Sequence, residues 1–95
     1  MSEVRRTVLI ANRRGLHARA SAKFVTLASS QPVEVAVAKE GAGDGAGVVT
    51  GTSIMGLMML GAAMGDHITI SAAGDGADTA VGALCELVEA KFGED

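Results

Sequence analysis

The residues around His17 combine a nucleophile with positive charge. A neutral imidazole can hold a phosphoryl group in a labile covalent bond. His17 stands between a predicted loop, Asn12–Gly15, and a helix predicted to begin at Ala18, so unpaired N–H groups of the first helical turn point toward its ring. These donors, the helix dipole and Arg19 all favour an anion attached to the ring. The pattern indicates a phosphate-accepting histidine, the alternative being a helix cap or an ordinary surface residue.

Positive charge gathers at this place although the chain as a whole is acidic. The 95 residues hold 8 Lys+Arg and 11 Asp+Glu, a formal net charge of −3. Residues 1–39 carry a net +5 and residues 40–95 a net −8. Four basic residues surround His17: Arg13, Arg14, Arg19 and Lys23. This favours a local site for an anion or an acidic partner, although solubilising surface charge would give the same count. For Lys23, solvated surface and a partner contact remain equal alternatives.

The composition excludes several other classes of protein. Phe24 and Phe92 are the only aromatic residues, which together with the acidic balance argues against nucleic-acid binding. Cys85 is the single cysteine, so we expect no disulfide and a protein that resides in the reducing cytoplasm. The longest apolar stretch, Ile54–Met64, has 11 residues, whereas a membrane span needs about 20. With no basic-then-apolar leader, we expect a soluble cytoplasmic protein with one domain over residues 1–95.

Other candidate sites receive plainer interpretations. The run Gly41–Gly47 lacks the Gly-Lys-Ser/Thr ending of a phosphate loop and joins two predicted strands, so it is expected to be a hairpin tip. His67, beside Asp66, is expected to be an ordinary surface or half-buried residue. Cys85 is expected to be a small core residue. A metal site fits poorly, because the only histidines are His17 and His67 and no acidic residue lies near His17; we expect no metal and no cofactor.

The elements that must position His17 follow from the hydrophobic pattern. Strands are predicted at Val4–Ile10, Val33–Lys39, Val48–Gly51 and His67–Ser71. A first helix is predicted to begin at Ala18 and to end before Pro32. A second is predicted at Ile54–Leu60, with Thr52 or Ser53 as its N-cap, and a third follows Asp75 or Asp78, either of which can be its N-cap. Their expected core faces are Ala20, Phe24, Leu27 and Ala28 in the first, Leu57 and Leu60 in the second, and Val81, Leu84, Val88 and Phe92 in the third. The order β-α-β-β-α-β-α favours an α+β sandwich with helices on one face of an antiparallel sheet.

Two signatures in the chain resemble those of HPr, the histidine-containing phosphocarrier family of the phosphoenolpyruvate-dependent phosphotransferase system. Gly15-Leu16-His17-Ala18-Arg19 resembles its active-site signature and Ser53-Ile54-Met55-Gly56-Leu57-Met58 its regulatory-serine signature. Gly65–Ser71 also resembles the final strand of the family. The resemblance implies an open-faced β-sandwich, in which a four-stranded antiparallel sheet of order 1-4-2-3 is covered on one face by three helices.

The resemblance also implies a function and its partners. His17 would accept phosphate on Nδ1 from Enzyme I and pass it to enzyme IIA proteins for sugar uptake, as a covalent relay and not as an enzyme, with Arg19 stabilising the phosphate. A regulatory branch that reports nitrogen or carbon status is the alternative within the family, and a binding module without covalent chemistry is the alternative outside it. Ser53 would be phosphorylated by an HPr kinase/phosphorylase. We expect a monomer that neither binds nucleic acid nor inserts into a membrane.

The short second helix is expected to supply part of the partner surface. A helix of this length cannot bury every side, so some of Ile54, Met55, Met58 and Met59 should be exposed. Flexible, polarizable methionine suits a surface that must fit several partners. By resemblance, Ile54, Met55 and Met58 lie beside His17 and dock Enzyme I and IIA proteins, and Lys23 joins them as a partner-binding residue.

The chain departs from the family pattern at two places. Ala20 stands where the family usually has proline, which predicts a helix with a softer first turn. The Gly41–Gly47 loop is longer than the usual one, and its distance in sequence from both signatures predicts no effect on phosphotransfer.

Overall fold

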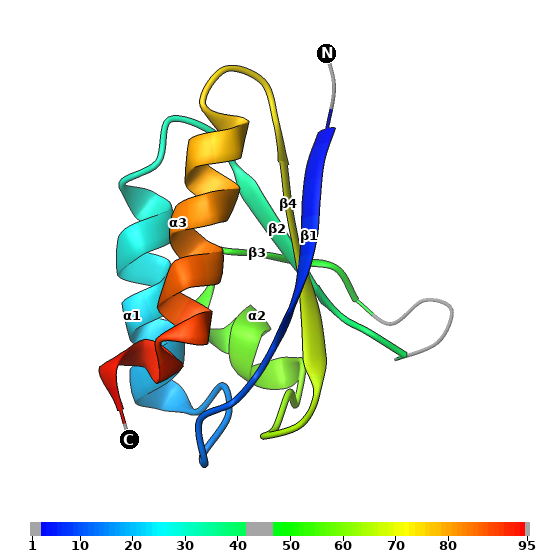
Figure 1. The fold of residues 1–95 in the computed structure, drawn as a ribbon, viewed down its shortest axis with the longest axis vertical. Coiled ribbons are helices and arrows are strands. Elements are labelled where there is room, and N and C mark those ends of the chain that lie inside the picture. Colours follow the sequence, from blue (N-terminus) through cyan, green and yellow to red (C-terminus); the bar gives the residue numbers. More distant parts are fainter. Residues whose placement is uncertain (1–2, 42–46, 95) are drawn as a thin grey trace.

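The computed structural model of the protein describes residues 3–41 and 47–94, and these form one sheet with helices against it. In chain order the elements are β1 (Glu3–Leu9), α1 (Ala18–Ser29), β2 (Val35–Lys39), β3 (Val49–Thr50), α2 (Ile54–Met59), β4 (His67–Ala73), α3 (Ala77–Glu89) and a short 3-10 turn, η1 (Lys91–Gly93). The sheet is antiparallel with the order β1-β4-β2-β3. The helices cover one side of it, with α1 and α3 side by side (Figure 1). The predicted α+β open-faced sandwich is therefore confirmed.

The central strand β4 organises the sheet. It pairs with β1 along its whole length and with β2 from Lys39↔Ile68 to Val35↔Ala72. Alternation puts Ile68 and Ile70 in the core, both fully buried. The strand runs two residues beyond the predicted end at Ser71, because Ala72 and Ala73 still find partners in β1. In contrast, β2 begins at Val35 instead of Val33, and β3 is limited to Val49–Thr50. Of the predicted hairpin tip, residues 42–46 lie outside the described part of the chain.

Helix α1 buries the face that the sequence indicates, with one difference. Ala20, Phe24 and Ala28 are buried, and so is Ser21, whereas Leu27 is only half-buried. The hydroxyl of Ser21 reaches the core side because it donates to the carbonyl of Leu16 at 3.2 Å. A polar residue is thereby satisfied inside the core, a pattern that apolar periodicity does not predict.

Helix α3 corrects two predictions from the sequence. Neither Asp75 nor Asp78 caps it: the N-cap is Gly76, with φ 90°, and a Cβ there would lie 2.7 Å from the ring of Pro32. The close approach of Pro32 and the left-handed backbone both require glycine. Phe92 does not continue the helical stripe either, since the helix ends at Glu89. It reaches the core from η1, where its own φ is 57°.

The remaining core and surface predictions agree with the structure. Val81, Leu84 and Val88 are fully buried, and so is Cys85, whose thiol has a pKa raised chiefly by burial. His67 is exposed at the start of β4. In the described residues, no helix has both the length and the apolar character needed to cross a membrane.

Candidate functional site

The loop before His17 is fixed against the segment that follows α2. The amide of Gly15 donates to the carbonyl of Asn12 at 3.2 Å, closing a turn in which Gly15 has φ 63°. The next amide, that of Leu16, donates to the carbonyl of Ala62 at 3.0 Å. The side chain of Leu16 is 5% exposed and so anchors the loop in the core. His17 therefore leaves a rigid loop and enters α1 directly.

His17 occupies the N-cap position of α1, but its side chain makes no capping hydrogen bond. Its backbone is extended (φ −73°, ψ 179°), and its carbonyl accepts the first intrahelical bond, from the amide of Ser21 at 2.9 Å. The amides of Ala18, Arg19 and Ala20 precede that bond, so they point out of the N-terminal end of the helix without helical acceptors. The ring itself is free of the capping role that the sequence left open as an alternative.

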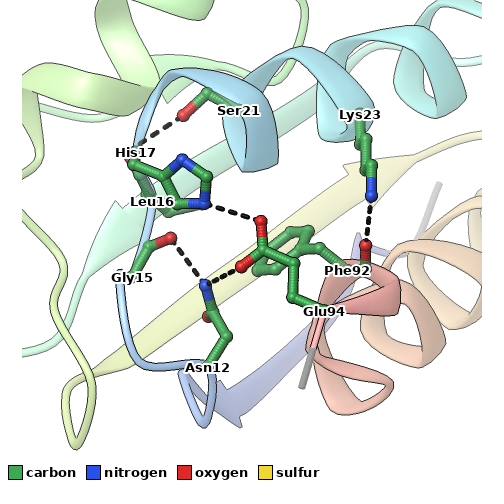
Figure 2. A network of polar contacts seen from close by, with 8 residues as sticks. All are labelled: Asn12, Gly15, Leu16, His17, Ser21, Lys23, Phe92 and Glu94. Atoms are coloured by element: carbon green, nitrogen blue, oxygen red, sulfur yellow. Dashed lines mark hydrogen bonds and ion pairs between the residues drawn. The ribbon is translucent and has the colours of Figure 1, made fainter.

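The imidazole instead contacts a carboxylate from the far end of the chain. His17 Nε2 lies 2.7 Å from Glu94 Oε2, and the two side chains are 17% and 16% exposed. The other oxygen, Glu94 Oε1, accepts a hydrogen bond from Asn12 Nδ2 at 3.1 Å. Figure 2 shows the three side chains converging below the start of α1. The prediction that no acidic residue lies near His17 is wrong, because it considered only neighbours in sequence.

The electrostatics of this contact favour the charged carboxylate. Burial by itself raises the pKa of Glu94, but hydrogen bonds from His17 and Asn12, together with the charges of His17 and Lys23, outweigh it and leave the pKa lowered. Glu94 is thus an acceptor for Nε2. Within residues 3–41 and 47–94, no three His, Cys, Asp or Glu side chains are grouped as metal ligands would be.

Arg19 and Lys23, both expected to carry positive charge at the site, differ in their surroundings. Arg19 is exposed on the first turn of α1 and makes no hydrogen bond or ion pair within the described part of the chain. Lys23 is exposed too, but its Nζ donates to the carbonyl of Phe92 at 2.7 Å. Arg19 therefore has a guanidinium available for an anion, whereas Lys23 joins α1 to the turn that precedes Glu94.

Helix α2 presents the apolar surface that the sequence predicts. Leu57 is fully buried and Leu60 partly, whereas the other large side chains are exposed: Ile54 by 40%, Met55 by 70%, Met58 by 42% and Met59 by 80%. We call Ile54, Met55 and Met58 the α2 patch. The helix packs against α1, and the segment that follows it accepts the hydrogen bond from the Leu16 amide at the Ala62 carbonyl.

Ser53 caps α2, as one of the two predicted candidates. Its Oγ accepts a hydrogen bond from the amide of Gly56 at 2.9 Å, and its backbone is extended. The side chain is half-buried and is followed directly by Ile54 and Met55. The neighbouring Thr52 is exposed and does not cap the helix.

Sequence reasoning missed Asn12 and Glu94. Asn12 is fully buried, and its Nδ2 donates to the carbonyl of Gly15 at 2.9 Å as well as to Glu94. An asparagine three residues before a glycine is a recognisable turn signal, so the structural role of Asn12 could have been predicted from the sequence. No sequence signal points to Glu94, since it follows the last helix and belongs to no helical or strand pattern of apolar residues.

Fold and site together describe a small α+β domain with a histidine at a helix N-terminus, and comparison with known proteins identifies the class. Residues 4–90 match the family model described as "PTS HPr component phosphorylation site". The chain belongs to the HPr family of phosphocarrier proteins of the phosphotransferase system.

Individual relatives cover almost the whole chain. The phosphocarrier protein NPr of Shewanella violacea is 40% identical, with 99% of this chain and 98% of that protein covered. The phosphocarrier protein HPr of Neisseria meningitidis serogroup A is 45% identical, with 96% and 97% covered. The crystal structure of HPr-C-His from Thermoanaerobacter tengcongensis superposes with a TM-score of 0.81 at 41% identity, covering 100% of this chain and 99% of that one.

Proposed function

We propose that His17 of this phosphocarrier accepts a phosphoryl group from phosphorylated Enzyme I and passes it to enzyme IIA proteins for sugar uptake. The observation that carries this proposal is the position of the His17 ring at the N-terminus of α1. There the amides of Ala18, Arg19 and Ala20 lack helical acceptors. The exposed guanidinium of Arg19 adds a positive charge that can follow the phosphate between donor and acceptor.

Phosphoryl transfer of this kind depends mainly on positioning and charge. The helix N-terminus and Arg19 would stabilise the equatorial oxygens while the phosphorus passes between two proteins. Nδ1 is the acceptor atom in this proposal, since Nε2 is engaged by Glu94. The protein is then a covalent relay that turns over no free small molecule. Residues 1–95 would form one such domain, acting in the cytoplasm.

A second destination for the phosphate is supported by one of the relatives. The Shewanella violacea protein is named NPr, not HPr. A regulatory branch, in which a non-transporting IIA protein reports nitrogen or carbon status, is therefore the second candidate. Transfer from the phosphorylated protein to a sugar-specific IIA and to a regulatory IIA, measured side by side, separates the two branches.

The surface around the site would provide docking and control. The α2 patch is exposed, and the segment after α2 contacts the His17 loop through the Leu16–Ala62 hydrogen bond; we assign the patch and Lys23 to the contact with Enzyme I and IIA proteins. Ser53, at the edge of the patch, is assigned to phosphorylation by an HPr kinase/phosphorylase. A phosphate adds about −1.5 to −2 charges, which would hinder docking of an apolar partner surface.

The experiment that tests the proposal is incubation with phosphoenolpyruvate and Enzyme I, followed by intact mass measurement. One acid-labile phosphoryl group is expected on the wild type and none on His17→Ala. The matched control is His67→Ala, because His67 is the other histidine and is exposed on β4; it should load like the wild type. No mass gain on the wild type would leave the binding module as the remaining hypothesis.

A further inference from the structure

The contact between His17 and Glu94 restricts where the ring can carry its proton. An ionised carboxylate only accepts hydrogen bonds, so at 2.7 Å from Glu94 Oε2 the atom Nε2 must be the donor. A neutral imidazole has one N–H, and its other nitrogen is bare. With the proton on Nε2, the lone pair is on Nδ1.

Glu94 is itself held in place by a buried donor. Asn12, fully buried, donates from Nδ2 to Glu94 Oε1 at 3.1 Å and to the Gly15 carbonyl at 2.9 Å. The Gly15 carbonyl fixes which end of the Asn12 amide faces Glu94, since a carbonyl accepts only from the NH₂ group. Both carboxylate oxygens are therefore assigned, one to Asn12 and one to His17 (Figure 2).

The backbone that delivers Glu94 is bent in an unusual way. Lys91 and Phe92 are non-glycine residues with φ of 58° and 57°, and Gly93 follows with φ 75°. Left-handed backbone at non-glycine residues is costly and persists only where the surroundings enforce it. Here Phe92 is 1% exposed, and its carbonyl accepts the hydrogen bond from Lys23 Nζ at 2.7 Å. The buried ring and the lysine thus hold η1 in the one shape that brings the next residue to His17.

We infer that Glu94 is a positioning residue for phosphoryl transfer, holding the proton on Nε2 of His17 so that Nδ1 is the nucleophile. This inference rests on the proposed function. In the step, the Nδ1 lone pair forms the N–P bond as the donor's bond to phosphorus breaks, and the electron pair of that bond stays with the donor. No proton has to leave, because the one on Nε2 remains there.

The same carboxylate compensates the charge that this step creates. Adding a phosphoryl group to Nδ1 while Nε2 keeps its proton gives the ring a positive charge. A carboxylate bound to the protonated nitrogen of a histidine stabilises such an imidazolium and fixes the tautomer before it forms. Glu94 lies outside the residues 4–90 matched by the family model, so this contact is not part of the matched signature.

Replacing Glu94 by glutamine gives a sharp test, because Asn12 determines how the new amide is placed. Asn12 presents an N–H and needs an acceptor, so the amide oxygen should turn toward it and the NH₂ group toward His17. A donor facing Nε2 requires the lone pair there and moves the ring proton to Nδ1. Glu94→Gln should therefore weaken the nucleophile, whereas Glu94→Ala should release the ring to a mixture of tautomers.

The experiment is nitrogen NMR of the histidine rings at alkaline pH, together with the rate of phosphoryl loading from phosphorylated Enzyme I. The wild type should show a protonated Nε2, and Glu94→Gln should show a shift of the proton toward Nδ1. Both Glu94 variants should take up the phosphoryl group at least roughly tenfold more slowly than the wild type. Glu89→Gln, an exposed glutamate at the end of α3, should match the wild type, and His67 serves as an internal reference.

Two results would overturn the inference: a wild-type ring protonated on Nδ1, or Glu94 variants that load as fast as the wild type. A wild type that takes no phosphoryl group from Enzyme I would reject the proposed function instead. The ring nitrogens would then still report whether Glu94 sets the tautomer of His17.

Discussion

Gly15 lies against the carbonyl of Ala62 so closely that no side chain fits between them. A Cβ on Gly15 would be 2.4 Å from the Ala62 oxygen and 2.8 Å from the Cα of Ala63. The position also has φ 63°, which side chains other than that of glycine rarely adopt. The Gly15–Ala62 contact therefore joins the loop of His17 to the segment that follows α2.

Gly15→Ala should destabilise the protein and slow phosphoryl loading. The left-handed backbone costs about 1–2 kcal/mol and the steric conflict about 1–3 kcal/mol, so urea unfolding should show a loss of about 2–5 kcal/mol. Gly61→Ala is the matched control, since Gly61 has φ 67° but nothing within 4 Å of its Cβ position. Equal losses in the two variants would show that the contact with Ala62 is not needed.

Arg19→Ala should leave the fold intact and slow phosphotransfer. The side chain is exposed and has no partner among the described residues, so its removal costs little stability. Losing one charged hydrogen bond to the phosphate should slow loading by roughly tenfold to a hundredfold. Arg5→Ala, on the opposite side of the sheet and paired with Glu3, should load normally. Unchanged kinetics in Arg19→Ala would mean that the backbone donors suffice.

Met55→Lys and Met58→Lys should weaken the complex with Enzyme I without unfolding the protein. Both side chains are exposed, by 70% and 42%, so the substitution disturbs the surface and not the core. A charge in the apolar centre of an interface typically costs 1 kcal/mol or more, about a fivefold to tenfold rise in Kd. Val48→Lys is the control, because Val48 is 68% exposed beside the sheet. Calorimetric titration with Enzyme I measures all three, and equal affinities would reject the assignment of the α2 patch.

Ser53→Asp should load more slowly than Ser53→Ala. Aspartate can accept from the Gly56 amide as serine does, so α2 keeps its cap, whereas alanine loses about 1 kcal/mol. The added charge stands next to Ile54 and Met55, where docking of a partner would desolvate it or bring it near acidic groups. The Enzyme I-dependent loading rate is the measurement. A folded Ser53→Asp that loads as fast as Ser53→Ala would leave Ser53 as a cap alone.

Asp66 should make stability depend on pH in a defined direction. Its Oδ2 accepts from the Ala63 amide at 2.9 Å and lies 3.5 Å from Lys39 Nζ. The Ala63 hydrogen bond lowers its pKa below the ordinary 3.8, burial opposes this, and Lys39 lowers it further. A carboxyl with a lowered folded-state pKa contributes stability above its unfolded-state pKa and loses it as the pH falls through the folded-state value.

Asp66→Asn should accordingly melt at a lower temperature than the wild type at neutral pH, and the difference should vanish well below pH 3.8. Thermal unfolding followed by circular dichroism at the two pH values is the measurement. The matched control is Asp75→Asn, an exposed residue before α3. A gap between Asp66→Asn and the wild type that persists in acid would assign the effect to packing instead of charge.

The sequence by itself indicates the four strands, the three α-helices and the exposed apolar side of α2, but not the turn η1. Alternation locates β4, and helical period locates α1 and α3, because these signals are carried by residues a few positions apart. The Ser53 cap and the exposure of Met55 follow from local chemistry and from the shortness of α2. Element ends were less exact, as in β4, since a strand ends where its partners end, and the partners are not visible in the strand itself.

Only the tertiary structure places Glu94 on the ring of His17. The two residues are 77 positions apart, and the contact exists because α3 packs beside α1, Phe92 turns back into the core and Lys23 holds the Phe92 carbonyl. The same holds for Gly76, which begins α3 because Pro32 lies against it. Patterns along the chain reflect interactions between residues that are close in sequence. The hydrogen-bond partner of the His17 ring depends instead on which distant groups the packed core brings within reach.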